Sequence, residues 1–234
     1  MVRAPLSDRF QGFADAEARF FKALAKNQNR AWFQAHKADY EQGWAQPMKL
    51  LLAEVRERVD SQFPHVDLAD EAKVFRIFRD VRFSKDKTPY KTHVAGILHV
   101  KRTGKITEVP AVLYAQFGAT ESFLAAGHYM MDGEQLARYR AAILDEKQGK
   151  EIAAILKKLE RAGYEPGSAE VLKKVPRGFD PEHPRAELLK RKGLVVSFPE
   201  VPKKLLPSRA LLDWVVKATK PVAPLVEWLT FATA

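Results

Sequence analysis

The sequence predicts an α+β fold in which a central, mainly antiparallel sheet is flanked by N-terminal and C-terminal helices. Apolar residues recur at spacings of three and four both early and late in the chain, which is typical of amphipathic helices. Strand-like segments lie between these two regions. The connections between the strands are too short for crossover helices, so neighbouring strands are expected to run antiparallel.

The first quarter of the chain predicts three helices. Apolar periodicity indicates the first over Ala14–Lys26, which ends at a polar turn. Asn29 is a suitable N-cap for a second helix that carries Trp32, Phe33, His36, Tyr40 and Trp44. Pro47 is expected to open the third helix, because proline is tolerated in a first turn.

The pattern changes to strands at Lys73. A first strand is predicted over Val74–Arg79, followed by a polar loop over Ser84–Pro89. Three further strands are predicted over Val94–Val100, Val109–Phe117 and Ser122–Ala126. These four segments supply the predicted sheet.

Helical periodicity returns in the second half, around Leu136–Leu144 and Ile152–Leu159, and Val171–Pro184 is irregular. The remaining predicted elements are a short helix over Glu187–Arg191, a strand over Leu194–Phe198, and a closing helical pair over Ala210–Thr219 and Leu225–Phe231.

The chain has 234 residues, which suits an N-terminal tail (residues 1–9) and one domain (residues 10–230). No cysteine occurs, which excludes disulfides, thiolate metal sites and a cysteine nucleophile. Neither the long apolar run of a signal peptide nor a membrane-length apolar stretch is present, so no membrane partner and a cytoplasmic location are expected.

The positive charge is concentrated in one segment. The formal net charge is +10, and residues 73–105 contain ten basic residues against Asp80 and Asp86. Such a local excess attracts phosphates, nucleic acid or acidic metabolites, although a solvated basic face gives the same count.

The centre of this segment, Arg79–His93, combines side-chain types that hold anions. Arginine offers a planar fork of donors and lysine a mobile charge. The predicted anion-binding residues here are Arg79, Arg82, Lys85, Lys87 and Lys91. Asp86 and Tyr90 are candidates for proton transfer. The alternative is a solvated loop in which Asp80 and Asp86 pair with neighbouring arginines.

A second candidate segment, Lys173–Pro184, is stiffened by prolines and carries Arg177, Asp180 and His183. Arg177 is predicted to bind the anion and His183 to act as an acid or base, if this loop forms the second wall of a pocket. Asp180 alternatively caps the turn after it.

Other common sites are not supported by the sequence. His93 and His99 lack a metal-binding spacing, and surrounding cations would repel a metal, so no metal site is predicted. No dinucleotide fingerprint, P-loop or nucleophile elbow occurs, and no cofactor is predicted.

Several motifs together resemble the domain of unknown function 2461 family. They are Arg79–His93, Lys173–Pro184, Phe10-Gln11-Gly12-Phe13 with Phe20-Phe21, and the pattern of aromatic and basic residues over Asn29–Tyr40. The resemblance covers Phe10–Leu229 and implies a compact α/β fold without an established reaction. It also implies that the candidate residues of both segments belong to the signature motifs of the family.

The sequence therefore favours a basic pocket for a phosphate- or carboxylate-bearing small molecule, walled by both segments. Catalysis there stays open, with Asp86, His183 or Tyr90 as the proton-transfer groups. The alternatives are a nucleic-acid-associated protein using the same basic surface, and a scaffold whose cations pair internally. The oligomeric state is not determined by the sequence.

Overall fold

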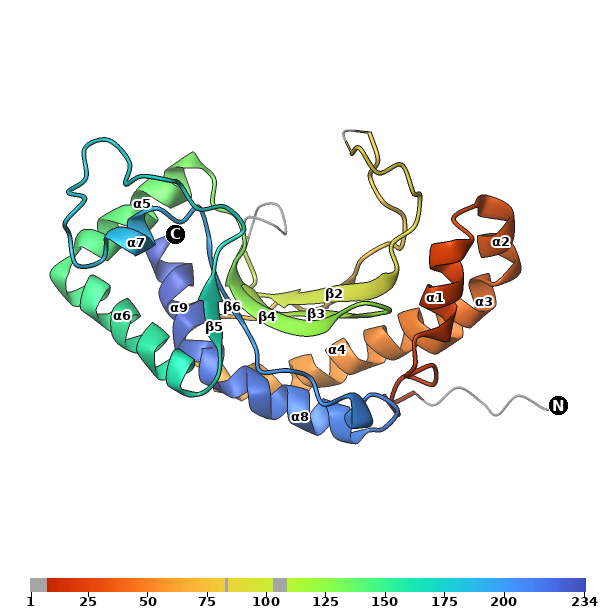
Figure 1. Ribbon diagram of the computed structural model, residues 1–234. Helices are drawn as coiled ribbons and strands as arrows, with labels where there is room; N and C mark the ends of the chain where they lie inside the picture. The colour runs from red at the N-terminus through yellow and green to blue at the C-terminus, as the bar shows by residue number, and fades with distance from the viewer. Residues whose placement is uncertain (1–7, 83, 103–108) are drawn as a thin grey trace.

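The computed structural model describes residues 8–82, 84–102 and 109–234. Its centre is a six-stranded antiparallel sheet with the strand order β1-β2-β3-β4-β6-β5 (Figure 1). The strands are β1 (Lys73–Val74), β2 (His93–His99), β3 (Ala111–Gly118), β4 (Ser122–His128), β5 (Glu165–Gly167) and β6 (Leu194–Ser197). β1 and β5 are thus the two edge strands.

Helices occupy both terminal regions, as the sequence predicts. In the described chain they are α1 (Arg19–Lys26), α2 (Arg30–Ala35), α3 (Lys37–Tyr40), α4 (Gln46–Val59), α5 (Gly133–Leu144), α6 (Glu146–Arg161), α7 (Ala186–Leu189), α8 (Ala210–Thr219) and α9 (Ala223–Ala232). A π-helical turn, η1, spans Glu41–Ala45, and short 3-10 turns lie at Asp60–Gln62, Lys203–Leu205 and Lys220–Val222. The predicted α+β class with its mainly antiparallel sheet is confirmed.

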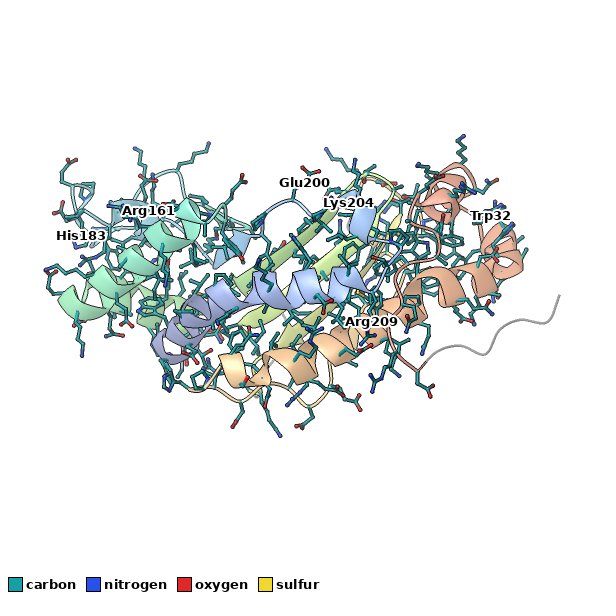
Figure 2. The ribbon with its side chains drawn as sticks, turned by 90° about the horizontal axis from the view of Figure 1, so that it is seen from below. Trp32, Arg161, His183, Glu200, Lys204 and Arg209 are labelled. Atoms are coloured by element: carbon teal, nitrogen blue, oxygen red, sulfur yellow. The ribbon has the colours of Figure 1, made fainter. Side chains whose placement is uncertain are left out.

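One face of the sheet is packed against helices. α4, α8 and α9 run beneath the strands (Figure 1), and Figure 2 shows the same helices from below. Packing is close, because a Cβ added to Gly96 of β2 would stand 2.4 Å from Leu52 Cδ1 of α4. The opposite face of β2, β3 and β4 is left open by the described part of the chain.

The N-terminal helices form largely where the sequence places them. The Asn29 side chain accepts a hydrogen bond from the Trp32 backbone N–H at 2.9 Å, which confirms the predicted N-cap. The first helix begins later than predicted, at Arg19. Its first two N–H groups, those of Arg19 and Phe20, donate to the Asp15 carboxylate at 2.9 Å, and Ala18 takes a left-handed φ of 53° before them. The second and third predicted helices join through η1 instead of breaking.

The strand predictions hold for β2, β3, β4 and β6 but not for Val74–Arg79. Only Lys73–Val74 pairs as a strand with β2, because the chain beyond Phe75 leaves the sheet and pairs with residues 89–91 instead. β5 was not predicted. Its sequence, Glu165-Pro166-Gly167, has low strand propensity, and it is tolerated at an edge where proline need not donate to a neighbour.

Residues 1–7 of the predicted tail and Lys105 of the basic segment lie outside the described residues. In the described ranges, no helix has the length and apolarity needed to cross a membrane.

Candidate functional site

The central basic segment forms a projecting hairpin, here called the basic arm (residues 75–82 and 84–92). Its two legs pair antiparallel: Arg79 N–H donates to Pro89 O at 2.9 Å, and Lys91 N–H donates to Ile77 O at 2.8 Å. Figure 1 shows the arm rising from one end of the open sheet face. The arm connects β1 to β2, so it stands at the β1 edge.

Several charges of the arm are engaged within the arm itself. Arg79 forms an ion pair with Asp86 and also donates to the Thr88 hydroxyl. Arg82 pairs with Asp80 at 2.6 Å. These hydrogen bonds lower the pKa of Asp86 and of Asp80 to about 2 in each case. Asp86 is therefore a very weak base at neutral pH, which argues against the predicted proton-transfer role.

Lys85 and Lys87 lie exposed near the tip of the arm. Lys87 Nζ donates to Val81 O at 2.9 Å, which ties its side chain back to the other leg. Neither lysine has a carboxylate within ion-pair distance among the described residues. Both can therefore add positive potential to the surroundings of the arm.

Tyr90, the second candidate for proton transfer, is part of the core. It is 3% exposed, and its ring stacks on Phe33 of α2 with centroids 4.6 Å apart and lies 5.3 Å from Phe78. The Gln28 side chain makes two hydrogen bonds to the backbone of Tyr90: it accepts from Tyr90 N–H at 3.0 Å and donates to Tyr90 O at 3.3 Å. These contacts fasten the base of the arm to the N-terminal helices.

The second predicted segment lies between β5 and α7. Arg177 is exposed there, and the Asp180 carboxylate accepts from Glu182 N–H at 2.9 Å, so Asp180 caps a turn. His183 Nδ1 accepts from Arg185 N–H at 3.1 Å. His183 thus supports the turn that leads into α7.

The arm and this second segment do not meet, which corrects the predicted pocket between them. They emerge from β1 and β5, the opposite edges of the sheet, and five spacings of about 4.8 Å place those edges roughly 24 Å apart. Figure 2 shows His183 at one end of the molecule and Trp32, on the helix α2 that holds the arm, at the other. Arg177 and His183 therefore cannot share a small anion with Arg79 or Arg82.

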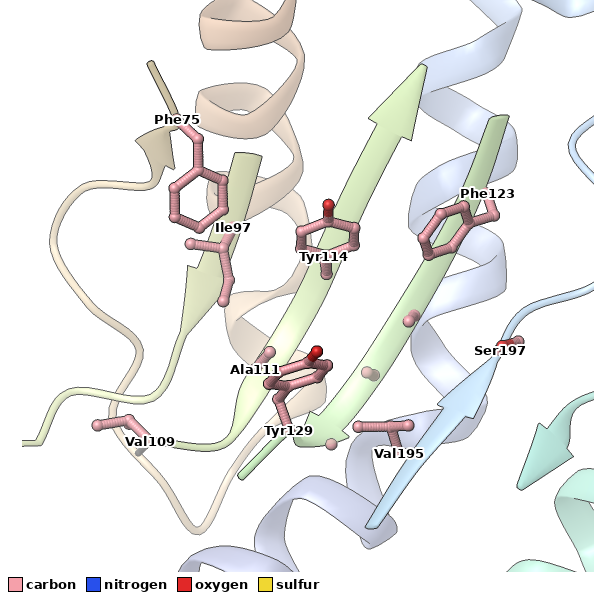
Figure 3. A pocket seen from close by; sticks show the side chains of 12 residues that line it. Phe75, Ile97, Val109, Ala111, Tyr114, Phe123, Tyr129, Val195 and Ser197 are labelled. Carbon is pink, nitrogen blue, oxygen red and sulfur yellow. The ribbon is translucent and has the colours of Figure 1, made fainter. Parts of the chain in front are cut away.

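Between the basic arm and the Lys173–Pro184 segment, the open sheet face contains a hollow of about 390 Å³ (Figure 3). Most of its lining is apolar. The lining residues are Phe75, Ile97, Val109, Ala111, Tyr114, Phe123, Ala125, Ala126, Gly127, Tyr129, Val195 and Ser197. A concave apolar site of this size lies in the lower part of the range of about 300–1,000 Å³ that is typical of small-ligand pockets.

Lys91 stands at the rim of this hollow, and the positive charge of Arg76 is near enough to act on it. Lys91 Nζ lies 5.7 Å from the ring centroid of Phe75 and 3.1 Å from Arg76 O. Burial and the positive charge of Arg76 lower the pKa of Lys91. Within the described ranges no carboxylate oxygen comes within 4.0 Å of either cation, although Arg76 is near enough to contribute to the low pKa of Asp80.

His93 adds a third basic group to this rim. It begins β2 and shares the open face with Ile97, because side chains alternate along a strand. Burial, followed by the charge of Lys91, lowers the pKa of His93. An anion bound beside Lys91 would offset the repulsion among these groups.

The aromatic residues of the hollow were not among the site residues predicted from the sequence. Phe75, Tyr114, Phe123 and Tyr129 lie on strands or follow them, and alternation could have placed the first three on the face opposite the core. A strand with one solvated face should carry polar residues there. Aromatic residues on both faces were therefore an available signal of a binding surface.

No set of three or more His, Asp or Glu side chains that could hold a metal ion occurs in the described ranges. The lining of the hollow carries few polar groups. Chemically, the arrangement can hold an apolar body beside positive charge.

Comparisons with known proteins identify the family. No curated protein and no solved structure matches the chain. The family described as conserved hypothetical protein (DUF2461) matches residues 16–228, which include the basic arm, the open sheet face and the Lys173–Pro184 segment. The chain belongs to this DUF2461 family.

Proposed function

We propose that the protein binds an anionic small molecule, carrying a phosphate or carboxylate, at the rim of the open sheet face. Lys91 and Arg76 contact the anionic oxygens, and His93 contributes a further donor. Lys85 and Lys87 on the arm increase the local concentration of anions. Arg79 and Arg82 have a positioning role, since their ion pairs shape the arm that carries Lys91.

One observation carries the proposal: the half-buried Lys91 stands over Phe75 of the hollow and close to the charge of Arg76, and neither cation has a carboxylate within ion-pair distance in the described chain. Holding like charges together costs free energy that a bound anion offsets, and such groups concentrate at functional sites. Solvated surface lysines are not held close to another cation and carry no such cost in free energy.

Equilibrium titration with inorganic phosphate tests this proposal. We expect Lys91→Met and Arg76→Met each to weaken phosphate binding by about 10-fold or more, because each removes a charged hydrogen bond. Lys204→Met is the matched control, since it removes one positive charge from a lysine on the helical side of the molecule (Figure 2). Equal weakening by all three variants would show a diffuse charge effect and contradict the proposal.

Nucleic-acid binding is the second candidate function. The specific observation in its favour is that basic residues stand at both ends of the open face, on the arm and at Lys173, Lys174 and Arg177, with aromatic rings between them. Binding of a single strand needs little beyond aromatic rings on which bases stack and cations that neutralise phosphates. If the protein binds nucleic acid, its affinity should fall steeply as the salt concentration rises, whereas the affinity for one small anion should fall only slightly.

A further inference from the structure

The open face carries a continuous row of aromatic rings that begins at the cationic rim. Phe75 lies 6.3 Å from Tyr114, and Tyr114 lies 5.6 Å from Phe123, measured between ring centroids. Figure 3 shows the three rings side by side across the strands. Lys91 stands over the first ring of this row, so positive charge and aromatic surface adjoin.

Small residues beside the row create the hollow. Ala111, Ala125 and Gly127 line its floor, and their short side chains leave the space that larger residues would fill. Gly127 has a φ of +116°, and a Cβ there would stand 2.3 Å from Leu194 O. The backbone at Gly127 thus requires glycine, which keeps this part of the floor open.

Tyr129 gives the hollow a second aromatic wall. Tyr129 is 56% exposed, although its backbone is held where Gly193 approaches closely. A Cβ on Gly193 would stand 2.2 Å from Tyr129 O. In Figure 3 the Tyr129 ring lies over the end of the hollow nearest Ala111 and Val195. An exposed ring on a fixed backbone is available for stacking.

Tyr114 remains uncharged at neutral pH. Burial, then the neighbouring Tyr129, then Glu121 raise the pKa of Tyr114 to about 12. The Tyr114 hydroxyl donates to Gln116 Oε1 at 2.8 Å. Tyr114 therefore gives the hollow a neutral aromatic lining, while one rim is cationic.

We infer that the ligand is a planar-ring anion, an aryl carboxylate or aryl phosphate. Its ring lies in the hollow against Tyr114 and Tyr129, and its anionic group contacts Lys91 and Arg76. This inference rests on the proposed anion binding and adds the chemical class of the ligand. A hollow of about 390 Å³ has room for one small ring system, whereas a strand of nucleic acid occupies a groove of about 4–16 nucleotides.

Calorimetric titration of the full chain with three probes tests the inference. The probes are inorganic phosphate, 2-naphthyl phosphate and uncharged 2-naphthol. We expect 2-naphthyl phosphate to bind at least about 30-fold more tightly than phosphate, because the ring buries apolar surface. Ala125→Leu, which fills the hollow, should remove about 10-fold or more of this gain and leave phosphate binding unchanged.

Three further variants complete the test. Ala153→Leu on the exposed face of α6 is the matched control and should leave all three affinities unchanged. Tyr129→Ala should weaken both naphthyl probes by about 5- to 150-fold, as loss of one stacking partner does, while Tyr129→Phe should not.

The outcomes separate this inference from the proposed function. If phosphate binds through Lys91 but 2-naphthyl phosphate binds no more tightly, the ring inference is overturned and the anion site stands. If 2-naphthol binds in the hollow and phosphate does not bind, the anion proposal fails. If a thymidylate 12-mer binds more than about 10-fold more tightly than the mononucleotide, with a steep salt dependence, a nucleic-acid strand replaces the small ligand.

Discussion

Tyr90 offers a direct test of whether the basic arm is anchored through its base. Replacement by alanine removes a ring that is 3% exposed and stacks on Phe33 at 4.6 Å between centroids. Truncating a buried aromatic ring to alanine costs about 3–5 kcal/mol, and the stacked pair accounts for about 0.5–1.5 kcal/mol beyond its buried area. We expect Tyr90→Ala to lower the free energy of unfolding by about 4 kcal/mol, and the Tm by about 8–16 °C.

Tyr90→Phe distinguishes anchoring from chemistry. It keeps the ring and removes the hydroxyl, which makes no hydrogen bond within the described residues, so a change in stability below about 1 kcal/mol is expected. Urea unfolding followed by tryptophan fluorescence measures both variants. A double-mutant cycle with Phe33→Leu should give a coupling of about 0.5–1.5 kcal/mol.

Two results would refute this reasoning. A loss below about 1 kcal/mol for Tyr90→Ala would mean that the arm is not cooperatively joined to the core. Loss of phosphate binding in Tyr90→Phe, with stability retained, would return the hydroxyl to the functional role that the sequence suggested.

Three further predictions concern local structure. Gly127→Ala should lower the free energy of unfolding by more than about 2 kcal/mol, because φ is +116° and the added Cβ meets Leu194 O. Gly133→Ala is the control: it has open space around it, so it should change the free energy of unfolding by less than about 0.5 kcal/mol. Thermal unfolding measures both variants. Asn29→Ala should cost about 1 kcal/mol in urea unfolding through loss of the cap on Trp32 N–H, while Asn29→Ser should retain most of it. The pKa of Asp86 in the folded protein, about 2, lies below its ordinary value of 3.8. The contribution of Asp86 to arm stability is therefore present above pH 3.8 and is lost as pH falls through about 2. A carboxyl NMR titration with a midpoint near 3.8 would contradict the ion pair between Arg79 and Asp86.

Local signals account for the parts of the fold that were predicted. The cap at Asn29 and the strands β2, β3 and β4 depend on neighbours within a few residues or on simple periodicity. The first strand was overextended for a physical reason. Residues after Phe75 have strand-like composition, and they do pair, but with the returning leg of the arm. Composition does not specify the partner.

The sequence by itself determined the α+β class, the family, and the position of the basic residues along the chain. The tertiary structure decided which of them can act together. Strand order placed the two basic segments at opposite edges, ion pairs engaged Arg79 and Arg82, and packing on Phe33 placed Tyr90 in the core. The same strand order gathered Phe75, Tyr114 and Phe123 into one row beside Lys91, because contacts between distant residues depend on strand pairing and not on residue type.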